Sequence, residues 1–211
     1  MLGANIGTTV TAQILTFPVI NYYPYLIALG LALALIGIFI RKRTFFYIGS
    51  SILFFGIVFA GLILMTFFFE SPEKRRLIES FLLYSSKNIY LGILTGTIIT
   101  AIIQSSSALT GVIIGLAFNE LINLRSSIAL ILGSNMGTCF TAYLASINAS
   151  PVSQKLARAH FIFNILGVLA LVPFYFLFEN LVRASSQELS RQIANAQTIF
   201  NIYNTLVFLP F

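Results

Sequence analysis

Charged residues are scarce in this chain of 211 residues: only 9% are Asp, Glu, Lys or Arg, whereas 58% are hydrophobic. The chain has no tryptophan, one histidine and one cysteine, and its mean hydropathy is +0.94. The lone Cys139 excludes an internal disulfide and a metal cage built from cysteines. So little polar surface cannot cover a soluble globule of this size. The composition therefore indicates an integral membrane protein, and its apolar segments are interpreted as spans.

The formal net charge is +6, from 12 Lys and Arg against 6 Asp and Glu. The basic residues occur in short clusters between apolar runs, such as 41–43 and 74–76. They do not form a stripe beside aromatic side chains, which a nucleic-acid-binding groove requires. We therefore expect no nucleic-acid partner. The clusters are interpreted as topology signals, with 41–43 on the cytoplasmic side.

Apolar runs of near-membrane length predict six transmembrane segments. They are residues 22–40, 44–69, 89–118, 124–146, 159–178 and 193–211. The charged stretch at 70–79 predicts a loop, and Pro173 and Pro210 are expected to kink or end the last two spans. The 30 residues of 89–118 are too many for one span, and Gln-Ser-Ser-Ser at 104–107 interrupts them. This interruption predicts a re-entrant hairpin or a broken helix.

Two stretches of the chain are repeated within it. Residues 2–12 align without gaps to residues 132–142, with seven of eleven positions identical. Residues 157–165 likewise resemble residues 194–202. Duplicated polar motifs inside apolar segments are typical of transporters built from internal repeats, whose binding site lies at the repeat interface near the bilayer midplane.

The first copy of the longer repeat is incomplete. Gln104 precedes Asn135 by 31 residues, whereas only four residues precede Asn5. The equivalent of Gln104 in the first copy would therefore lie before Met1. We expect the chain to be a fragment or a split gene product.

The repeated motif itself is Gly-x-Asn-x-Gly-Thr, at 133–138 and at 3–8. Its glycines allow close approach of the backbone, and its Asn and Thr oxygens can act as ligands. Both copies are therefore predicted to be the unwound parts of broken spans. The alternative is that they are small-residue contacts between helices, which are common in membranes.

The motif at 104–107 places four polar side chains at bilayer depth, where an unpaired hydroxyl or amide costs about 1–3 kcal/mol. Three hydroxyls, a carboxamide and the free N–H groups of a helix entered at Ala108 suit an oxyanion. The same oxygens can coordinate sodium. No Lys, Arg or His occurs from 88 to 119, so cations that travel with the anion must offset its charge. This favours cation-coupled transport over an anion pore.

Structural roles compete with these functional ones. A run of serines alone more often bonds to its own helix or packs against a neighbour, but the adjacent Gln104 and the duplicated Asn motif favour a binding site. His160 is matched by Gln197 in the other copy, which favours a hydrogen-bonding role over a metal or proton-relay role. Asn164 and Asn201 could be ligands or could form hydrogen bonds between helices, and the second role is favoured.

The order of the motifs at 100–108, 133–138 and 157–164 resembles the second repeat of the type II sodium-phosphate cotransporter family. Residues 3–9 resemble the end of that family's first repeat, although the first Gln-Ser-Ser-Ser is lacking. The resemblance implies an inverted-repeat carrier in which two such tips meet and hold phosphate and sodium. The implied ligands are Gln104, Ser105, Ser106, Ser107, Asn135, Thr138, Asn5 and Thr8. The candidate sodium ligands are Gln104, Ser105, Ser106 and Thr138, and no cofactor is expected besides this coupling ion.

The sequence thus predicts one all-α, multi-spanning transporter domain with re-entrant or broken helices in the cell membrane. Residues 1–20 end the first repeat, 21–80 hold two spans and a charged loop, 81–150 form the second repeat, and 151–211 hold two further spans. The expected partners are phosphate, sodium, the bilayer, and a missing N-terminal half or a second copy.

The function indicated is sodium-dependent phosphate transport by alternating access, and the alternative is a non-transporting membrane subunit or remnant. An enzyme is not expected, because no nucleophile, base and orienting group occur in one apparent site.

Overall fold

The helices of this chain were located in a computed structural model that describes residues 2–16, 22–69, 72–73, 76 and 88–210. They are α1 (Leu2–Leu15), α2 (Tyr23–Phe39), α3 (Arg43–Phe69), α5 (Ile89–Ile103), α6 (Ser106–Phe118), α7 (Leu124–Ser146), α8 (Pro151–Leu171), the 3-10 turn η2 (Val172–Phe174), α9 (Tyr175–Ala184) and α10 (Leu189–Phe208). The chain divides into two compact units. One is Phe17–Lys74, and the other combines Met1–Thr16 with Arg75–Phe211.

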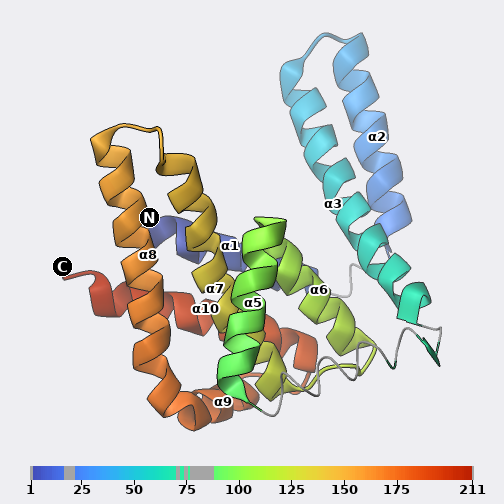
Figure 1. Cartoon of the computed structure of the whole chain (residues 1–211). Coiled ribbons are helices and arrows are strands. Elements are labelled where there is room, and N and C mark those ends of the chain that lie inside the picture. The colour runs from blue at the N-terminus through green and yellow to red at the C-terminus, as the bar shows by residue number, and fades with distance from the viewer. Residues whose placement is uncertain (1, 17–21, 70–71, 74–75, 77–87, 211) are drawn as a thin grey trace. The chain divides into compact units, whose positions relative to one another are not determined.

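The unit Phe17–Lys74 contains the hairpin of α2 and α3 (Figure 1). Glycines bring the two helices together: a Cβ on Gly37 would collide with the backbone of Phe46, and one on Gly49 with the backbone of Ala34. Such contacts between small residues let helix backbones approach closely. The predicted spans 22–40 and 44–69 are confirmed as helices. The predicted loop at 70–79 lies outside the described residues apart from positions 72, 73 and 76, which are helical.

The apolar segment 89–118 forms two helices, α5 and α6, which meet at Gln104 and Ser105. Figure 1 shows them as the two arms of a hairpin. The predicted interruption at the Gln-Ser-Ser-Ser motif is therefore confirmed.

The second predicted interruption, at 133–138, is wrong, because α7 runs unbroken from Leu124 to Ser146. The Asn135 amide donates to the carbonyl of Ile131 at 2.9 Å, and the Thr138 hydroxyl donates to that of Ser134 at 2.9 Å. These bonds keep the side chains of Asn135 and Thr138 within their own helix. The copy at 3–8 is also continuous helix within α1, so the prediction of an unwound segment is wrong there too.

The two glycines of α7 instead form a helix contact. A Cβ on Gly133 would fall on the carbonyl oxygen of Ile93 in α5, and one on Gly137 would collide with Thr97 and Thr100. Since both positions advance together along the two chains, α5 and α7 pack in parallel. The small-residue alternative for this copy of the motif is thus confirmed.

The predicted span 159–178 begins earlier and ends in a kink. Ser150 accepts a hydrogen bond from the backbone of Ser153 and is followed by Pro151, so α8 starts at a capped first turn. It ends at Leu171, and Pro173 lies in the 3-10 turn that leads to α9, as expected of a proline. The last predicted span, 193–211, is a helix, α10, which begins at Leu189 and ends before Pro210, but it is not among the described helices that are apolar enough to cross a membrane.

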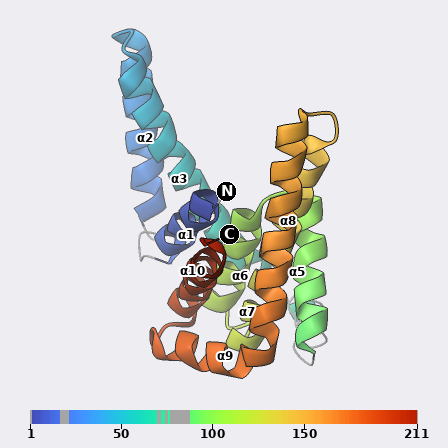
Figure 2. The ribbon, with the colours of Figure 1, turned by 90° about the vertical axis from the view of Figure 1, so that its left-hand side faces the viewer.

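In the larger unit, α5, α7 and α8 run side by side, while α1 and α10 lie together across them (Figures 1 and 2). The fully buried apolar residues of this unit include Ile113, Ile128, Leu132, Ile193 and Phe200, and polar side chains such as Gln197 and Asn201 are buried with them. Helix α9 crosses the end of the bundle from which α7 starts.

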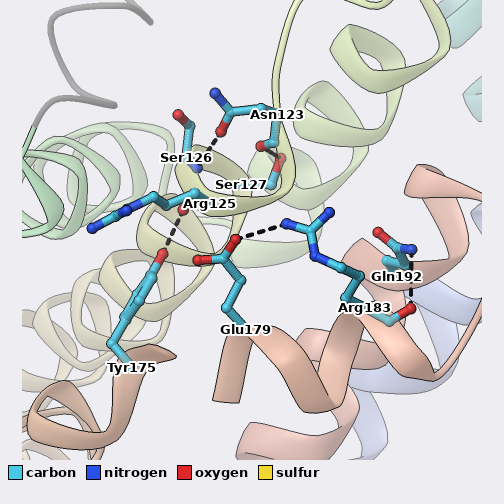
Figure 3. Close-up of polar contacts among 8 residues, drawn as sticks. All are labelled: Asn123, Arg125, Ser126, Ser127, Tyr175, Glu179, Arg183 and Gln192. Carbon is cyan, nitrogen blue, oxygen red and sulfur yellow. Dashed lines mark hydrogen bonds and ion pairs between the residues drawn. The ribbon is translucent and has the colours of Figure 1, made fainter. Parts of the chain in front are cut away.

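Polar contacts hold this end together (Figure 3). Asn123 caps α7 by accepting from the backbone N–H of Ser126 at 2.8 Å. The Tyr175 hydroxyl of α9 donates to the carbonyl of Arg125. Within α9, Arg183 forms an ion pair with Glu179 at 2.8 Å. These contacts involve α7 and α9 but none of the predicted ligands, so we assign them a structural role.

Three helical segments of the described chain are long and apolar enough to cross a membrane: Arg43–Gly61, Leu124–Ser146 and Pro151–Ala184. Helices α2, α5 and α6 are also apolar but contain only 17, 15 and 13 residues. Large apolar side chains are exposed on the surface, among them Phe39, Ile102 and Phe176. This surface fits a hydrocarbon solvent and not water.

Candidate functional site

The turn between α5 and α6 is the centre of the predicted site. Gln104 ends α5 with a φ of 61°, in the left-handed region. This conformation costs a non-glycine residue about 1–2 kcal/mol. Ser105 is extended and caps α6 by accepting from the N–H of Ala108 at 3.2 Å. The chain thus reverses in two residues, and strain of this kind is found at functional sites.

This turn is rich in unused hydrogen-bond donors. The Ser105 oxygen accepts a bond, which leaves its own hydrogen free to donate. The hydroxyls of Ser106 and Ser107 make no hydrogen bond to the residues that the structure describes. The first α-helical bond runs from Leu109 to the carbonyl of Ser105, so the N–H groups of Ser106 and Ser107 lie ahead of the ladder. Hydroxyls and free N–H groups at a helix N-terminus make an anion-binding arrangement.

Helix α7 lies against the last turns of α5 through its glycines, whereas Asn135, two residues from both Gly133 and Gly137, is on the opposite face of α7. Gly137 lies against Thr100 and Ala101, one turn before Gln104. The hydrogen of the Thr138 hydroxyl is given to the carbonyl of Ser134, so this oxygen has only lone pairs to offer a ligand. Such an oxygen suits a cation better than an anion.

The residues predicted from the first copy lie in a different junction. Asn5 of α1 donates to the side chain of Asn164 at 3.1 Å, and its oxygen lies 3.2 Å from His160 Nε2. The Asn201 side chain of α10 donates to the Asn5 carbonyl at 2.9 Å. Thr8 donates to the same carbonyl at 2.7 Å. Both predicted residues are thus bound within a junction of α1, α8 and α10, and among the described residues neither bonds to the turn at 104–107.

This arrangement can be compared with known proteins. A family model described as Na+/Pi-cotransporter matches residues 1–66 and 74–191 of the chain. The chain belongs to the Na+/Pi-cotransporter family. The uncharacterized protein YqeW of Bacillus subtilis (strain 168) is 30% identical over 174 residues, which are 82% of this chain and 55% of the relative.

Relatives with named functions match over shorter stretches. The sodium-dependent phosphate transport protein 2C of Rattus norvegicus is 45% identical over 85 residues, 38% of this chain and 14% of its own length. The human sodium-dependent phosphate transport protein 2B is 42% identical over 91 residues, 41% of this chain and 13% of its own. The chain therefore spans little more than half of the bacterial relative and a small part of these mammalian ones. No solved structure matches the chain.

Sequence reasoning missed three buried hydroxyls in α5 and α7 of this Na+/Pi-cotransporter family member. The side-chain oxygens of Thr100, Ser134 and Thr141 are buried and have no partner among the described residues. Ser134 and Thr141 lie on the same face of α7 as Thr138, because these positions are four and three residues apart. The spacing of these hydroxyls could have indicated that they share one helix face. The prediction that the motif is unwound prevented this interpretation.

The histidine is a hydrogen-bonding residue in this structure, as its pairing with Gln197 in the repeat suggests. His160 contacts Asn5, and the described residues include no group of three or more His, Cys, Asp or Glu that could hold a metal ion. The interpretation of Asn164 and Asn201 as bonds between helices is confirmed, since both contact Asn5.

Proposed function

We propose that this chain is a part of a sodium-dependent phosphate carrier, placed in the cell membrane as a multi-pass protein and working by alternating access. The observation that carries the proposal is the turn at 104–107, which gathers unused donors on a strained two-residue reversal. Membership of the Na+/Pi-cotransporter family supports the choice of phosphate as the anion.

In this proposal the turn binds phosphate. The hydroxyls of Ser105, Ser106 and Ser107 donate to its oxygens, together with the free N–H groups of the first turn of α6. The Gln104 carboxamide can donate as well, and Gln104 is exposed at the turn. No Lys, Arg or His occurs from 88 to 119, so sodium ions bound nearby must offset the phosphate charge.

Sodium is assigned to oxygens that have lone pairs to offer. The Thr138 hydroxyl gives its hydrogen to its own helix, and Ser134 and Thr141 on the same face have buried oxygens without partners among the described residues. The oxygens of Gln104, Ser105 and Ser106 border the same end of α5 and complete the candidate set. Hard cations prefer such neutral oxygens when no carboxylate is present.

The carrier needs a further helix, supplied by an N-terminal half or a second copy. In α7 the glycines of the repeated motif hold α5 at backbone distance. In α1 a Cβ on the equivalent Gly3 or Gly7 would meet no described atom within 4 Å. The open face of α1 therefore fits a helix equivalent to α5, which would bring a second Gln-Ser-Ser-Ser turn in an inverted-repeat arrangement.

Uptake of radiolabelled phosphate into proteoliposomes tests the proposal, with sodium or choline outside and with or without the N-terminal half of a relative. Sodium-dependent uptake is expected. Ser106→Ala should lower uptake at least about tenfold, because a hydrogen bond to a charged group contributes about 1.5–3 kcal/mol. Ser51→Ala is the matched control, since the exposed Ser51 bonds only to the Tyr47 carbonyl of its own helix. No uptake from folded protein in either arrangement would support a non-transporting membrane subunit.

A further inference from the structure

Helix α10 reaches the phosphate-binding turn through one buried carboxamide. Gln197 is 1% exposed, and its Oε1 lies 3.0 Å from the hydroxyl of Thr110 in α6. The Thr110 hydroxyl, also buried, lies 2.9 Å from the carbonyl oxygen of Ser106. Ser106 is the first residue of α6 and one of the predicted phosphate ligands. A continuous chain of polar contacts thus links α10 to the first turn of α6.

The two hydrogen-bond contacts of the Thr110 hydroxyl depend on each other. A threonine hydroxyl has a single hydrogen, so it cannot donate fully to both Gln197 and the Ser106 carbonyl at once. Which acceptor it serves depends on how the Gln197 amide is turned, since that amide can present either its oxygen or its NH2 group. Because Gln197 and Thr110 are both buried, water cannot replace either bond, and an unpaired group there is costly.

The internal repeat supplies an independent observation. His160 of α8 occupies the position equivalent to Gln197, and its side chain also reaches another helix, at Asn5 of α1. Asn5 belongs to the other ligand-bearing motif. In both copies, then, the same position fastens a C-terminal helix to a helix that carries predicted ligands, although the partner differs.

We propose that Gln197 is a positioning residue that acts through Thr110 to hold the first turn of α6 and therefore the hydroxyl donors of Ser106 and Ser107. The inference rests on the proposed phosphate site for its functional consequence. Its structural part concerns the first turn of α6 alone and is measured without phosphate.

The first measurement is phosphate binding by calorimetry to the full chain in sodium chloride. Gln197→Met keeps the length of the side chain and removes its hydrogen bonds. We expect the phosphate Kd to rise about five- to tenfold, which is the loss of one net hydrogen bond. Thr110→Val should raise the phosphate Kd by a similar factor. Thr110→Ser keeps the hydroxyl and should leave the Kd near that of the parent chain.

Gln192→Met is the matched control on the same helix. Gln192 is also buried, but it lies near the N-terminus of α10. Its amide donates to the carbonyls of Arg183 and Ser186. The Gln192→Met substitution should lower the melting temperature without changing the phosphate Kd. Equal changes of Kd in Gln192→Met and Gln197→Met would overturn the positioning role and leave only a structural one.

The second measurement separates this inference from the proposed function. Ser107→Cys in a Cys139→Ser background places a thiol on the first turn of α6, and its rate of reaction with a maleimide reports how firmly that turn is held. Gln197→Met should raise this rate several-fold, while the rate of a cysteine at the exposed Ser150 stays constant. If the parent chain binds no phosphate, the proposed function fails. The maleimide rate still tests whether Gln197 holds the first turn of α6. An unchanged rate at position 107 would overturn this positioning role.

Discussion

Replacing single glycines in the two copies of the repeated motif should have opposite effects on stability. Gly133→Ala places a methyl group on the carbonyl oxygen of Ile93 and close to the backbone nitrogen of Thr97. Both are backbone atoms, so no side chain can move aside, and α5 must separate from α7. Overpacking of this kind costs about 1–3 kcal/mol, and the upper end is expected here. Alanine also favours the helix by about 1 kcal/mol, which leaves a net loss of about 2 kcal/mol.

Gly7→Ala is the matched control in the other copy. A methyl group there meets no described atom within 4 Å, so only the gain in helix propensity of about 1 kcal/mol remains. The difference between the two variants, about 3 kcal/mol, is the cost of the collision itself, because the propensity gain is common to both.

Unfolding of the purified chain by SDS in mixed micelles, followed by circular dichroism, measures both values. Equal stabilities for Gly133→Ala and Gly7→Ala would refute the close contact of α5 with α7. The proposed partner helix adds a second condition. Once an N-terminal half is bound, Gly7→Ala should weaken that association, whereas an unchanged affinity would count against the open face of α1 as its docking site.

Three further predictions concern single hydrogen bonds and the strained turn. His160→Gln should keep the bond to Asn5 and the unfolding free energy, whereas His160→Leu should lower the latter by about 1–3 kcal/mol in the same SDS assay. Gln104→Gly should stabilise the chain by about 1 kcal/mol by removing left-handed strain, yet weaken phosphate binding in calorimetry because the carboxamide is lost. Tyr175→Phe removes one donor to the Arg125 carbonyl and should lower the free energy of unfolding by about 1 kcal/mol in the SDS assay; an unchanged value would contradict the contact.

The interruption of α5 and α6 could be predicted because two independent signals agree. The apolar run 89–118 is too long for one span, and its polar residues are contiguous. The start of the second helix was placed too late, at Ala108, because the capping role of Ser105 was not used; α6 begins at Ser106. The beginning of α8 carried an equally clear signal, Ser150 followed by Pro151, which the apolar pattern alone placed too late.

The motif at 133–138 misled the prediction because its residues have two physical uses. Glycine and asparagine weaken an isolated helix, but glycines four residues apart also form one narrow face. The backbone of α5 fills that face at Gly133 and Gly137. Which use applies depends on a neighbouring helix, and the local sequence does not identify that neighbour.

Contacts between helices that are distant in the sequence could not be predicted for the same reason. The repeat showed that His160 and Gln197 are equivalent, and a hydrogen-bonding role followed. That one contacts Asn5 and the other Thr110 depends on how α8 and α10 pack, which no local pattern encodes. The unpartnered hydroxyls of Thr100 and Ser134 became visible only once α5 and α7 were placed together.

The glycine contact between α5 and α7 also bears on how this molecule can move. Two backbones in direct contact leave no side chains that could change rotamer, so the pair should behave as one rigid body. The carboxamides that join α1, α8 and α10 are different, because each can exchange one partner for another with little change in energy. We therefore expect any rocking motion to occur where those amides meet, with the turn at 104–107 carried along unchanged on the α5–α7 pair.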